Sequence, residues 1–236
     1  MGPTLLACPP RATGGVTMAD SGDRTVYDDG EVTIEMLTPV GPYGNSAYII
    51  RPAGGGAVTL IDVPAGYEDV LEALGDEPVE RVVVTHSHRD HWDGFDVMRA
   101  AIDAPVFAGA EETEIDPARG VERLADGAEI TIGGATMRVI HTPGHTPGSI
   151  CLLLGGALFS GDTLFPGGPG ASRSNELLQQ EIASITSRLY PLPDETLVLP
   201  GHGTGTTIGE SRSEYEVFAS KEHDPDLHGD VLWLES

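Results

Sequence analysis

The sequence predicts a mixed α/β (α+β) fold in which two β-sheets pack face to face with helices on the outside. Three observations support this expectation. Apolar runs typical of strands recur in both halves of the chain, segments with helical periodicity lie between them, and no linker-like stretch divides the chain. With 236 residues, 39% of them apolar, the chain can bury a substantial core. We therefore expect a single domain over residues 23–236.

The first strands follow from the apolar pattern after residue 30. Residues 31–37 alternate between polar and apolar side chains, as in a half-buried strand. Residues 46–51 and 57–62 are apolar-rich runs typical of buried strands, and the glycines at 54–56 form the turn between them. Helical spacing over 67–74 then predicts a short helix.

The apolar residues 82–85 predict the next strand, which is followed by a helix over 93–101 and a strand over 105–108. Leucine and isoleucine recur at helical spacing over 175–190, which predicts an amphipathic helix whose apolar stripe belongs to the core. The remaining strands are expected at 129–132, 136–140, 149–154, 157–160 and 196–199. Strands in both halves with helices between them are what a two-sheet sandwich requires.

The net charge of −24, with a single lysine, argues against several classes of partner. Nucleic-acid binding requires a basic patch that contacts phosphates, and an anionic membrane surface also attracts basic segments. No stretch approaches the roughly 20 apolar residues of a membrane span. We therefore expect a small-molecule substrate, no nucleic acid and no membrane partner, and we interpret the acidic surface as an adaptation for solubility.

The two cysteines, Cys8 and Cys151, lie far apart in unlike surroundings. A disulfide framework is therefore not expected, and the predicted location is the reducing cytoplasm. Residues 1–22 are rich in Gly, Pro, Ala and Thr and lack periodicity, which predicts a disordered leader. Met18 is an alternative to Met1 as the true start of the chain.

The run from His86 to His91, H-x-H-x-D-H, is the most informative segment of the chain. It places His88 and Asp90 between the two outer histidines, directly after the apolar residues 81–85. Side chains this crowded cannot act independently, and neutral imidazole and carboxylate are ligands that zinc accepts. The run therefore predicts a metal site, against the alternative of a solvated polar loop.

Four further segments place a possible metal ligand at the end of an expected strand beside a glycine-rich turn. These residues are Asp62, His145, Asp162 and His202. Glycine at a strand end allows the backbone to approach a shared point closely. We therefore expect these strand ends to meet at the metal site.

In this order, the five segments resemble the motifs of the metallo-β-lactamase superfamily, and within it the short bacterial glyoxalase II-like (hydroxyacylglutathione hydrolase-like) hydrolases. The resemblance covers about residues 30–208. It implies a four-layer αβ/βα sandwich of two mixed sheets with helices outside. Only 34 residues follow His202, with Arg212 and Lys221 as their only cations, so the resemblance does not extend to the basic glutathione-binding region of longer members.

The resemblance implies two metal ions and assigns their ligands. His86, His88 and His145 bind the first ion, Asp90, His91 and His202 bind the second, and Asp162 bridges them. Two zinc ions are expected, although imidazole and carboxylate also accept iron or manganese. Asp62 matches the first family motif and is expected to hold a ligand histidine or a strand end, the alternative being a plain turn cap.

The implied reaction is hydrolysis, in which a hydroxide bridging the two metals attacks a carbonyl carbon and the metals stabilise the oxyanion. Asp90 and Asp162 are the catalytic carboxylates in this scheme. The expected substrate is a thioester, an S-acyl-glutathione or a related acyl-thiol. Arg173 is the expected contact for a substrate carboxylate, and an ordinary surface arginine is the alternative.

Other activities of the superfamily remain open. A lactonase would use the same ligands with a tyrosine near the oxyanion, for which Tyr190 and Tyr215 are available. A persulfide dioxygenase would bind a single iron, but that branch carries an arginine–aspartate motif where this chain has residues 163–168. A class B3 β-lactamase would lack the bridging Asp162, and the acidic charge disfavours a nuclease. A non-catalytic zinc scaffold is disfavoured because structural sites are closed and often contain cysteine.

The remaining residues that could contribute to a site are interpreted as structural. They are His141, Thr142, Thr146 and Cys151 near the motifs, and His223 and His228 in an acidic tail. Residues 230–234 are apolar enough to dock on their own domain or on a second copy of the chain. The sequence therefore leaves a monomer and a homodimer open.

Overall fold

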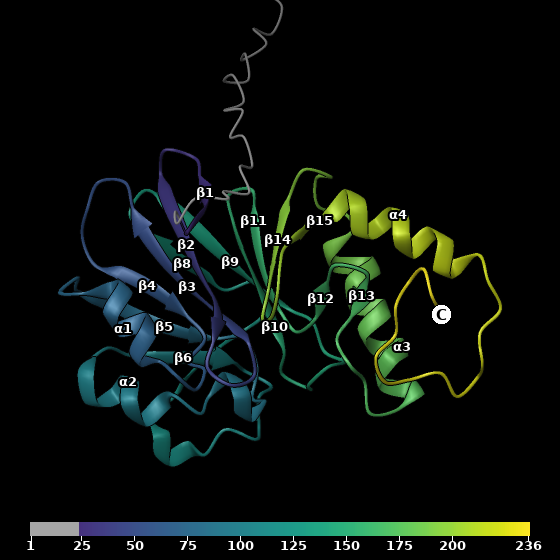
Figure 1. The fold of residues 1–236 in the computed structure, drawn as a ribbon, viewed down its shortest axis with the longest axis horizontal. Coiled ribbons are helices and arrows are strands. Elements are labelled where there is room, and N and C mark those ends of the chain that lie inside the picture. Colours follow the sequence, from purple (N-terminus) through teal and green to yellow (C-terminus); the bar gives the residue numbers. More distant parts are fainter. Residues whose placement is uncertain (1–23) are drawn as a thin grey trace, which may run out of the picture.

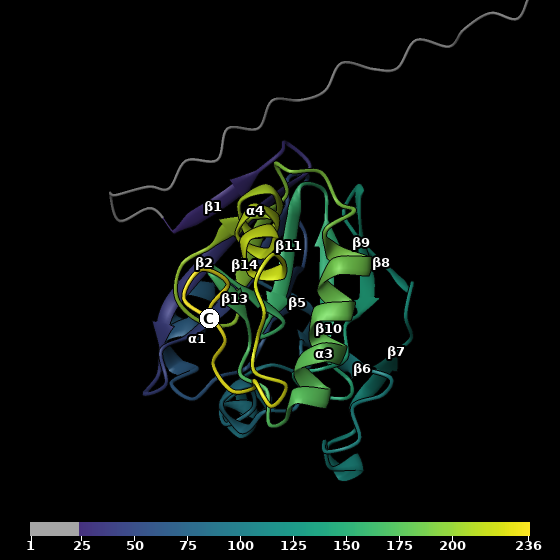
Figure 2. The same cartoon turned by 90° about the vertical axis from the view of Figure 1, so that its right-hand side faces the viewer.

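The computed structural model describes residues 24–236, so the predicted leader, with Met18 and Cys8, lies outside the described residues. Within the described part, no helix is long and apolar enough to cross a membrane. Figures 1 and 2 show two sheets face to face, with α1 and α2 on the outer side of one and α3 and α4 on the outer side of the other. The predicted four-layer α/β sandwich is thereby confirmed.

The first half of the described chain forms a seven-stranded sheet in the order β1 to β7. Its strands are β1 (Thr25–Asp28), β2 (Val32–Val40), β3 (Asn45–Pro52), β4 (Val58–Ile61), β5 (Val79–Val84), β6 (Val106–Gly109) and β7 (Glu122–Leu124). Strands β1 to β4 pair antiparallel and β4 to β7 pair parallel, so the sheet is mixed. Parallel neighbours need crossover connections, and α1 (Glu68–Leu74) and α2 (Phe95–Ala101) supply two of them.

The second half forms a six-stranded sheet in the order β15-β14-β11-β10-β9-β8. Its strands are β8 (Glu129–Ile132), β9 (Ala135–His141), β10 (Ile150–Leu154), β11 (Ala157–Gly161), β14 (Leu197–Pro200) and β15 (Thr206–Thr207). A small hairpin of β12 (Leu164–Phe165) and β13 (Gly168–Pro169) follows β11. Helix α3 (Asn175–Ser184), continued by a π-helical turn over Ile185–Leu189, then crosses to β14, which pairs parallel with β11.

Three clusters of buried side chains fill the three spaces between the four layers. Representative members, from the outer face of the first sheet to the outer face of the second, are Val70, Met98 and Leu60, then Ile61, Val83 and Phe159, and finally Leu158, Ile185 and Phe218. Successive strand residues point to opposite faces, so Leu60 packs on the helices whereas Ile61 packs on the other sheet. Because such strands are buried on both faces, they appear in the sequence as continuous apolar runs.

Helix α4 (Ile208–Ala219) was not predicted from the apolar pattern. Its buried positions are Ile208, Ser211 and Phe218, which is too sparse a stripe to show helical periodicity. The start of the helix nevertheless carries a capping signal, because Thr207 Oγ1 accepts a 3.2 Å hydrogen bond from the Glu210 N–H in a T-x-x-E sequence. This N-cap threonine was the sign by which the sequence could have revealed the helix.

The C-terminal apolar segment docks on its own chain. Val231 and Trp233 are 1% and 0% exposed, and the Trp233 ring lies 5.2 Å from that of Tyr215 and 4.8 Å from that of Phe218. Leu232 and Leu234, which alternate with these buried residues, are 42% and 53% exposed. Burial of Trp233 therefore needs no second copy of the chain.

Candidate metal centre

The predicted site residues meet at one edge of the sandwich, where strands of both sheets end. Asp62 follows β4, His86 follows β5, and Asp162 follows β11. Backbone hydrogen bonds join the sheets at this edge: the Ile150 N–H donates to Thr85 O at 3.0 Å and the Ser46 N–H donates to Gly201 O at 2.7 Å. The apolar strands thus act as a rigid support that brings polar strand ends from distant parts of the sequence together.

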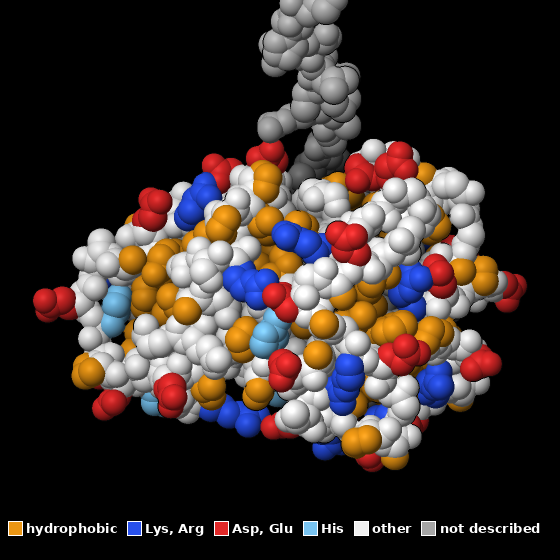
Figure 3. Space-filling view, turned by 180° about the vertical axis from the view of Figure 1, so that it is seen from behind, with side chains coloured by type: hydrophobic (Ala, Val, Ile, Leu, Met, Phe, Trp, Pro, Cys, Tyr) orange, Lys and Arg blue, Asp and Glu red, His pale blue; other side chains and the backbone are white. Residues whose placement is uncertain are grey.

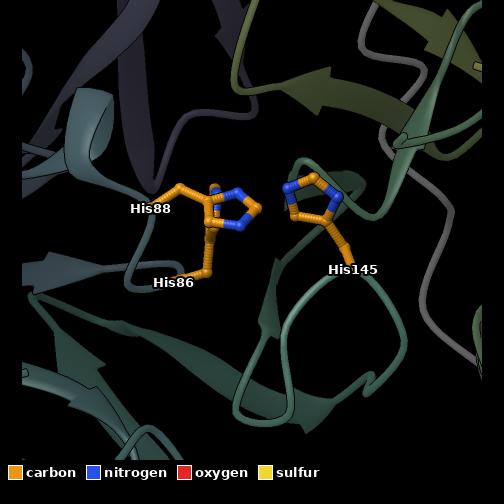
Figure 4. Close-up of side chains that lie close together, drawn as sticks. All are labelled: His86, His88 and His145. Atoms are coloured by element: carbon orange, nitrogen blue, oxygen red, sulfur yellow. The ribbon is translucent and has the colours of Figure 1, made fainter. Parts of the chain in front are cut away.

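One group of donors consists of three imidazoles. The ring centroids of His86 and His88 are 4.9 Å apart, those of His86 and His145 are 4.9 Å apart, and those of His88 and His145 are 4.4 Å apart. Figure 4 shows the rings of His86 and His88 facing His145, which extends from the loop between β9 and β10. Their nearest nitrogen atoms lie within 4.8 Å of one another.

A second group consists of Asp90, His91 and His202. Asp90 Oδ2 lies 3.5 Å from His91 Nε2 and 3.1 Å from His202 Nε2. Asp162 lies between the two groups, with Oδ2 at 3.9 Å from His86 Nε2, 3.6 Å from His145 Nε2 and 3.6 Å from His202 Nε2, and Oδ1 at 3.3 Å from His91 Nε2. The structure therefore brings all seven predicted ligands into one cluster.

Contacts at the Nδ1 atoms orient four of the rings. Nδ1 of His91 faces Asp62 Oδ2 at 2.9 Å, that of His145 faces Ala171 O at 3.1 Å, that of His202 faces Tyr43 O at 3.2 Å, and that of His86 faces Thr85 Oγ1 at 3.1 Å. Carbonyl and carboxylate oxygens only accept hydrogen bonds, so in the first three rings Nδ1 carries the proton. Their Nε2 atoms face Asp162 and are the ring atoms left to bind a metal.

Asp62 lies directly behind this cluster and is 1% exposed. Its φ of 62° lies in the left-handed region that residues other than glycine rarely occupy. In this conformation Oδ1 accepts a 2.7 Å hydrogen bond from the Thr85 N–H, and Oδ2 accepts a 3.0 Å bond from Thr85 Oγ1. Because Oδ2 also contacts His91, Asp62 joins the end of β5 to a ring of the cluster.

The carboxyls of the cluster ionise readily, but not every imidazole is neutral. Against burial, Asp162 and Asp62 raise the pKa of His91 well above its usual value, so metal binding must displace a proton from this ring. Burial alone would raise the pKa of Asp162, but His91, with smaller contributions from His86 and His145, holds that pKa well below its usual range. Burial likewise opposes ionisation of Asp90, and His202 and His91 outweigh it and lower the pKa of this carboxyl. Burial lowers the pKa of His145 to about 4, which leaves its imidazole neutral at pH 7.

The donor set fits divalent metal ions. Ligand atoms lie within 4.8 Å of one another in each of three combinations: His86, His88 and His145; His86, His91 and Asp162; and Asp90, His91 and His202. The buried Nε2 atoms of His86 and His145 have no hydrogen-bond partner among the described residues, which is costly unless a cation occupies the space between them. Imidazoles and carboxylates without cysteine suit zinc, iron or manganese.

Asn45, which no sequence pattern revealed, also lies in the cluster. It is fully buried at the start of β3, and its Nδ2 donates to Asp90 Oδ2 at 3.0 Å. The same nitrogen lies 3.3 Å from Nε2 of both His91 and His202. The position of Asn45 in the sequence could not predict its contact with the histidines. The contact arises because the start of β3 forms a bridge with His202 in the folded chain.

Two further residues, Gly201 and Glu112, shape the centre although neither is a predicted metal ligand. Gly201 touches the cluster so closely that a Cβ atom there would overlap Asp162 Oδ1 and lie 2.6 Å from His91 Cε1. Glu112 is buried beneath the loop that carries His145 and accepts hydrogen bonds from Thr146 Oγ1 at 2.8 Å and from the Gly148 N–H at 2.9 Å.

Arg173 lies at the centre, with Nη2 3.4 Å from His88 Nε2. His141 points away from the centre, because its Nε2 faces Pro147 O at 2.9 Å. The Tyr190 hydroxyl contacts Ser211 O at 3.1 Å in the core beneath α4, which is not a position from which it could contact an oxyanion.

Tyr215, the second tyrosine available for a lactonase, and two of the residues interpreted as structural, Cys151 and His223, also pack away from the ligands. Tyr215 packs on Trp233 in the same core. Cys151 is fully buried, and burial raises the pKa of its thiol to about 11. His223 stacks on Phe218 with ring centroids 3.8 Å apart.

A family model described as the metallo-beta-lactamase superfamily matches residues 40–202, which include nearly all of these side chains. The chain belongs to the metallo-β-lactamase superfamily. This family membership confirms the resemblance based on the five motifs. It also agrees with the layered arrangement of two sheets and outer helices.

Relatives of this metallo-β-lactamase superfamily protein include enzymes with a named activity. An uncharacterized protein of Aquifex aeolicus is 31% identical over 76% of this chain and 94% of its own length. A hydroxyacylglutathione hydrolase of Cereibacter sphaeroides is 33% identical over 72% of this chain. The matched region spans 66% of that hydrolase, so about a third of the hydrolase has no counterpart here.

Solved structures share the fold at similar identity. The crystal structure of ETHE1 from Myxococcus xanthus is 29% identical, has a TM-score of 0.67, and the match covers 80% of this chain and 85% of that chain. The structure of TTHA1623 in a di-iron-bound form is 30% identical, has a TM-score of 0.63, and the match covers 75% of this chain and 96% of that chain. The superfamily and the ligand cluster together imply divalent metals such as zinc or iron.

Proposed function

We propose that this protein is a metal-dependent hydrolase that cleaves a small-molecule thioester, an S-acyl-glutathione or a related acyl-thiol. The observation that carries the proposal is the position of Asp162 between two groups of three donors, with its carboxylate oxygens within 3.9 Å of imidazole nitrogens from both groups. A shared carboxylate with three further ligands on each side suits two metal ions. His86, His88 and His145 would hold one ion, and Asp90, His91 and His202 the other.

Bound divalent ions supply Lewis acidity, which lowers the pKa of water towards 7 and polarises a substrate carbonyl. The residues of the chain fix the charge and the geometry of this site. Asp162 and Asp90 provide two negative charges at neutral pH, because the surrounding imidazoles lower the pKa of both carboxyls. Asp62 keeps the His91 ring in one orientation and one tautomer through the 2.9 Å contact at Nδ1.

The thioester substrate is supported by the hydroxyacylglutathione hydrolases among the relatives. Arg173, at 3.4 Å from His88, is our proposed contact for a substrate carboxylate. A small-molecule substrate also agrees with the charge distribution, since basic side chains lie singly or in small groups among acidic ones on the face drawn in Figure 3. Nucleic acid would require a basic surface instead.

The test is hydrolysis of S-lactoylglutathione and of a neutral acyl-thioester by the metal-loaded protein, with thiol release followed by a thiol reagent. We expect turnover of at least one thioester, and a loss of about 10²-fold or more in Asp162→Ala. The matched control is His223→Ala, which removes an imidazole that stacks on Phe218 outside the cluster, and it should keep wild-type turnover.

Two outcomes would count against the proposal. Turnover of a lactone without turnover of any thioester would indicate the lactonase activity. A single equivalent of iron, with consumption of oxygen in the presence of a persulfide and no thiol release from thioesters, would indicate a dioxygenase.

A further inference from the structure

A cavity of about 400 Å³ opens directly beside the ligand cluster. His145, Asp162 and His202 form its inner side. Its outer wall comes from two segments that are distant in the sequence, namely the β12–β13 hairpin with Phe165 and the C-terminal strap, by which we mean residues 229–234. The strap contributes Asp230, Val231 and Leu232 to the lining.

The strap is held in place on both sides of these three lining residues. Gly229 and Ser172 exchange two backbone hydrogen bonds, of 3.0 and 3.2 Å, before the lining residues. After them, the Trp233 N–H donates to Gly167 O at 2.7 Å, and the fully buried Trp233 ring anchors the strap in the core. Figure 1 shows this last segment of the chain running beside β13 and α3. The position of the wall is therefore fixed by the fold.

The outer part of the cavity has an apolar surface. Phe165, Pro166, Val231 and Leu232 line it, and Leu232 is 42% exposed although it is a large apolar side chain. Apolar surface that faces a cavity beside reactive groups favours an apolar ligand, because each buried methylene removes further surface from water.

The charge of the cavity wall disfavours an anionic ligand at the strap. Asp230 lies in this wall and, unlike Asp162 at the inner side, is not a predicted metal ligand, so a bound metal would not neutralise it directly. Arg173, whose guanidinium contacts His88, is not among the described residues that line it. A carboxylate on the part of the ligand that lies against the strap would therefore meet the charge of Asp230, with no Lys or Arg among the described lining residues to pair with it.

We propose that this cavity takes the acyl group of the substrate, that this group is apolar and uncharged, and that Leu232 and Asp230 of the C-terminal strap determine the selectivity. The proposal rests on the proposed thioester hydrolysis for its kinetic test. It concerns only the acyl side of the substrate.

The kinetic test uses a series of N-acetylcysteamine thioesters with the full-length, metal-loaded protein. From acetyl to hexanoyl, kcat/KM should rise roughly two- to fourfold for each added methylene. Leu232→Ala should reduce the gain with chain length, so that kcat/KM falls more for the hexanoyl than for the acetyl thioester. Leu234→Ala is the matched control, because Leu234 is 53% exposed on the same strap but does not line the cavity, and it should behave as the wild type.

Asp230→Asn tests the charge selectivity. It should raise kcat/KM for a succinyl thioester about fivefold relative to the butyryl thioester, since it removes one like charge at short range in a hydrated site. Equal kcat/KM for the acetyl and hexanoyl thioesters would overturn the proposal. So would a ratio of succinyl to butyryl kcat/KM that Asp230→Asn leaves unchanged.

A binding measurement separates this proposal from the proposed function. The probe is the non-hydrolysable thioether S-hexyl-N-acetylcysteamine, compared with its S-ethyl analogue by calorimetry. Tighter binding of the hexyl probe that weakens in Leu232→Ala but not in Leu234→Ala supports the cavity assignment even if no thioester is hydrolysed. Equal binding of both probes by the wild type would overturn the assignment even if thioesters are hydrolysed.

Discussion

Glu181 of α3 lies behind the metal centre and offers a quantitative test of the electrostatics. Its side chain is fully buried, and its Oε1 accepts a 3.2 Å hydrogen bond from the Gly170 N–H. Oε2 has no hydrogen-bond partner among the described residues. Burial, together with the charge of Asp162 and against the Gly170 hydrogen bond, raises the pKa of Glu181 from 4.5 to about 9.

The direction of the pH dependence follows from this raised pKa. At pH 7 Glu181 is protonated in the folded protein but ionised in the unfolded chain, so unfolding releases a proton. Its contribution to stability is therefore complete below pH 4.5 and is lost as the pH rises towards about 9. The slope is about 1.4 kcal/mol per pH unit, which amounts to about 3 kcal/mol lost at pH 7.

Glu181→Gln removes the titration and keeps an oxygen that can accept the Gly170 hydrogen bond. Relative to the wild type, we expect the free energy of unfolding of this variant to increase by about 1.4 kcal/mol for each pH unit between pH 6 and pH 8. Urea unfolding of both proteins at pH 6, 7 and 8, with the same metal loading, measures this difference.

The matched control is Glu176→Gln, an exposed position on the same helix, where the difference from the wild type should stay within about 0.5 kcal/mol. A difference between wild type and Glu181→Gln that does not change with pH would refute the reasoning. Such a result would mean that Glu181 is already ionised in the folded protein.

Three further substitutions test separate parts of the structure. Asp62→Ala frees the His91 ring, and metal affinity, measured by competition with a chelator, should fall by about 10- to 100-fold; unchanged affinity would contradict the role of the 2.9 Å contact. Gly201→Ala places a methyl group against Asp162, so the folded variant should bind less metal, whereas full metal content would show that the backbone yields at this point. Trp233→Ala should cost about 3–5 kcal/mol of unfolding free energy, and a loss below about 1 kcal/mol would mean that the C-terminal strap is not anchored in the core.

The apolar strands were predictable because each is buried between two layers and is therefore marked by a continuous apolar run. Strands β4 and β5, for example, pack on helices with Leu60 and Val82 and on the other sheet with Ile61 and Val83. Helix α4 lacked such a mark because few of its side chains are buried. The capping signal at Thr207 was the better guide there.

The ligand cluster could be predicted as a set of residues but not as a geometry. The spacing from His86 to His91 and the strand-end positions of Asp162 and His202 indicated metal chemistry, and the structure brings these side chains together. Asn45 could not be predicted, because a single buried amide contributes by tertiary contact and carries no pattern in the sequence.

The C-terminal strap shows what apolar patterning leaves undecided. The alternation of residues 231–234 was compatible with docking on the same chain or on a second copy. Packing of Trp233 against Tyr215 and Phe218 decides between them for the buried residues. That contact depends on helix α4, which the apolar pattern did not predict.

The most direct test of the central claim, a centre that holds two metal ions around Asp162, is metal analysis of the protein purified without added metal, alongside Asp162→Ala and the His223→Ala control. We expect two equivalents of zinc, iron or manganese per chain in the wild type and the control, and no more than one in folded Asp162→Ala. One equivalent or less in the wild type, or two equivalents retained by Asp162→Ala, would contradict the account.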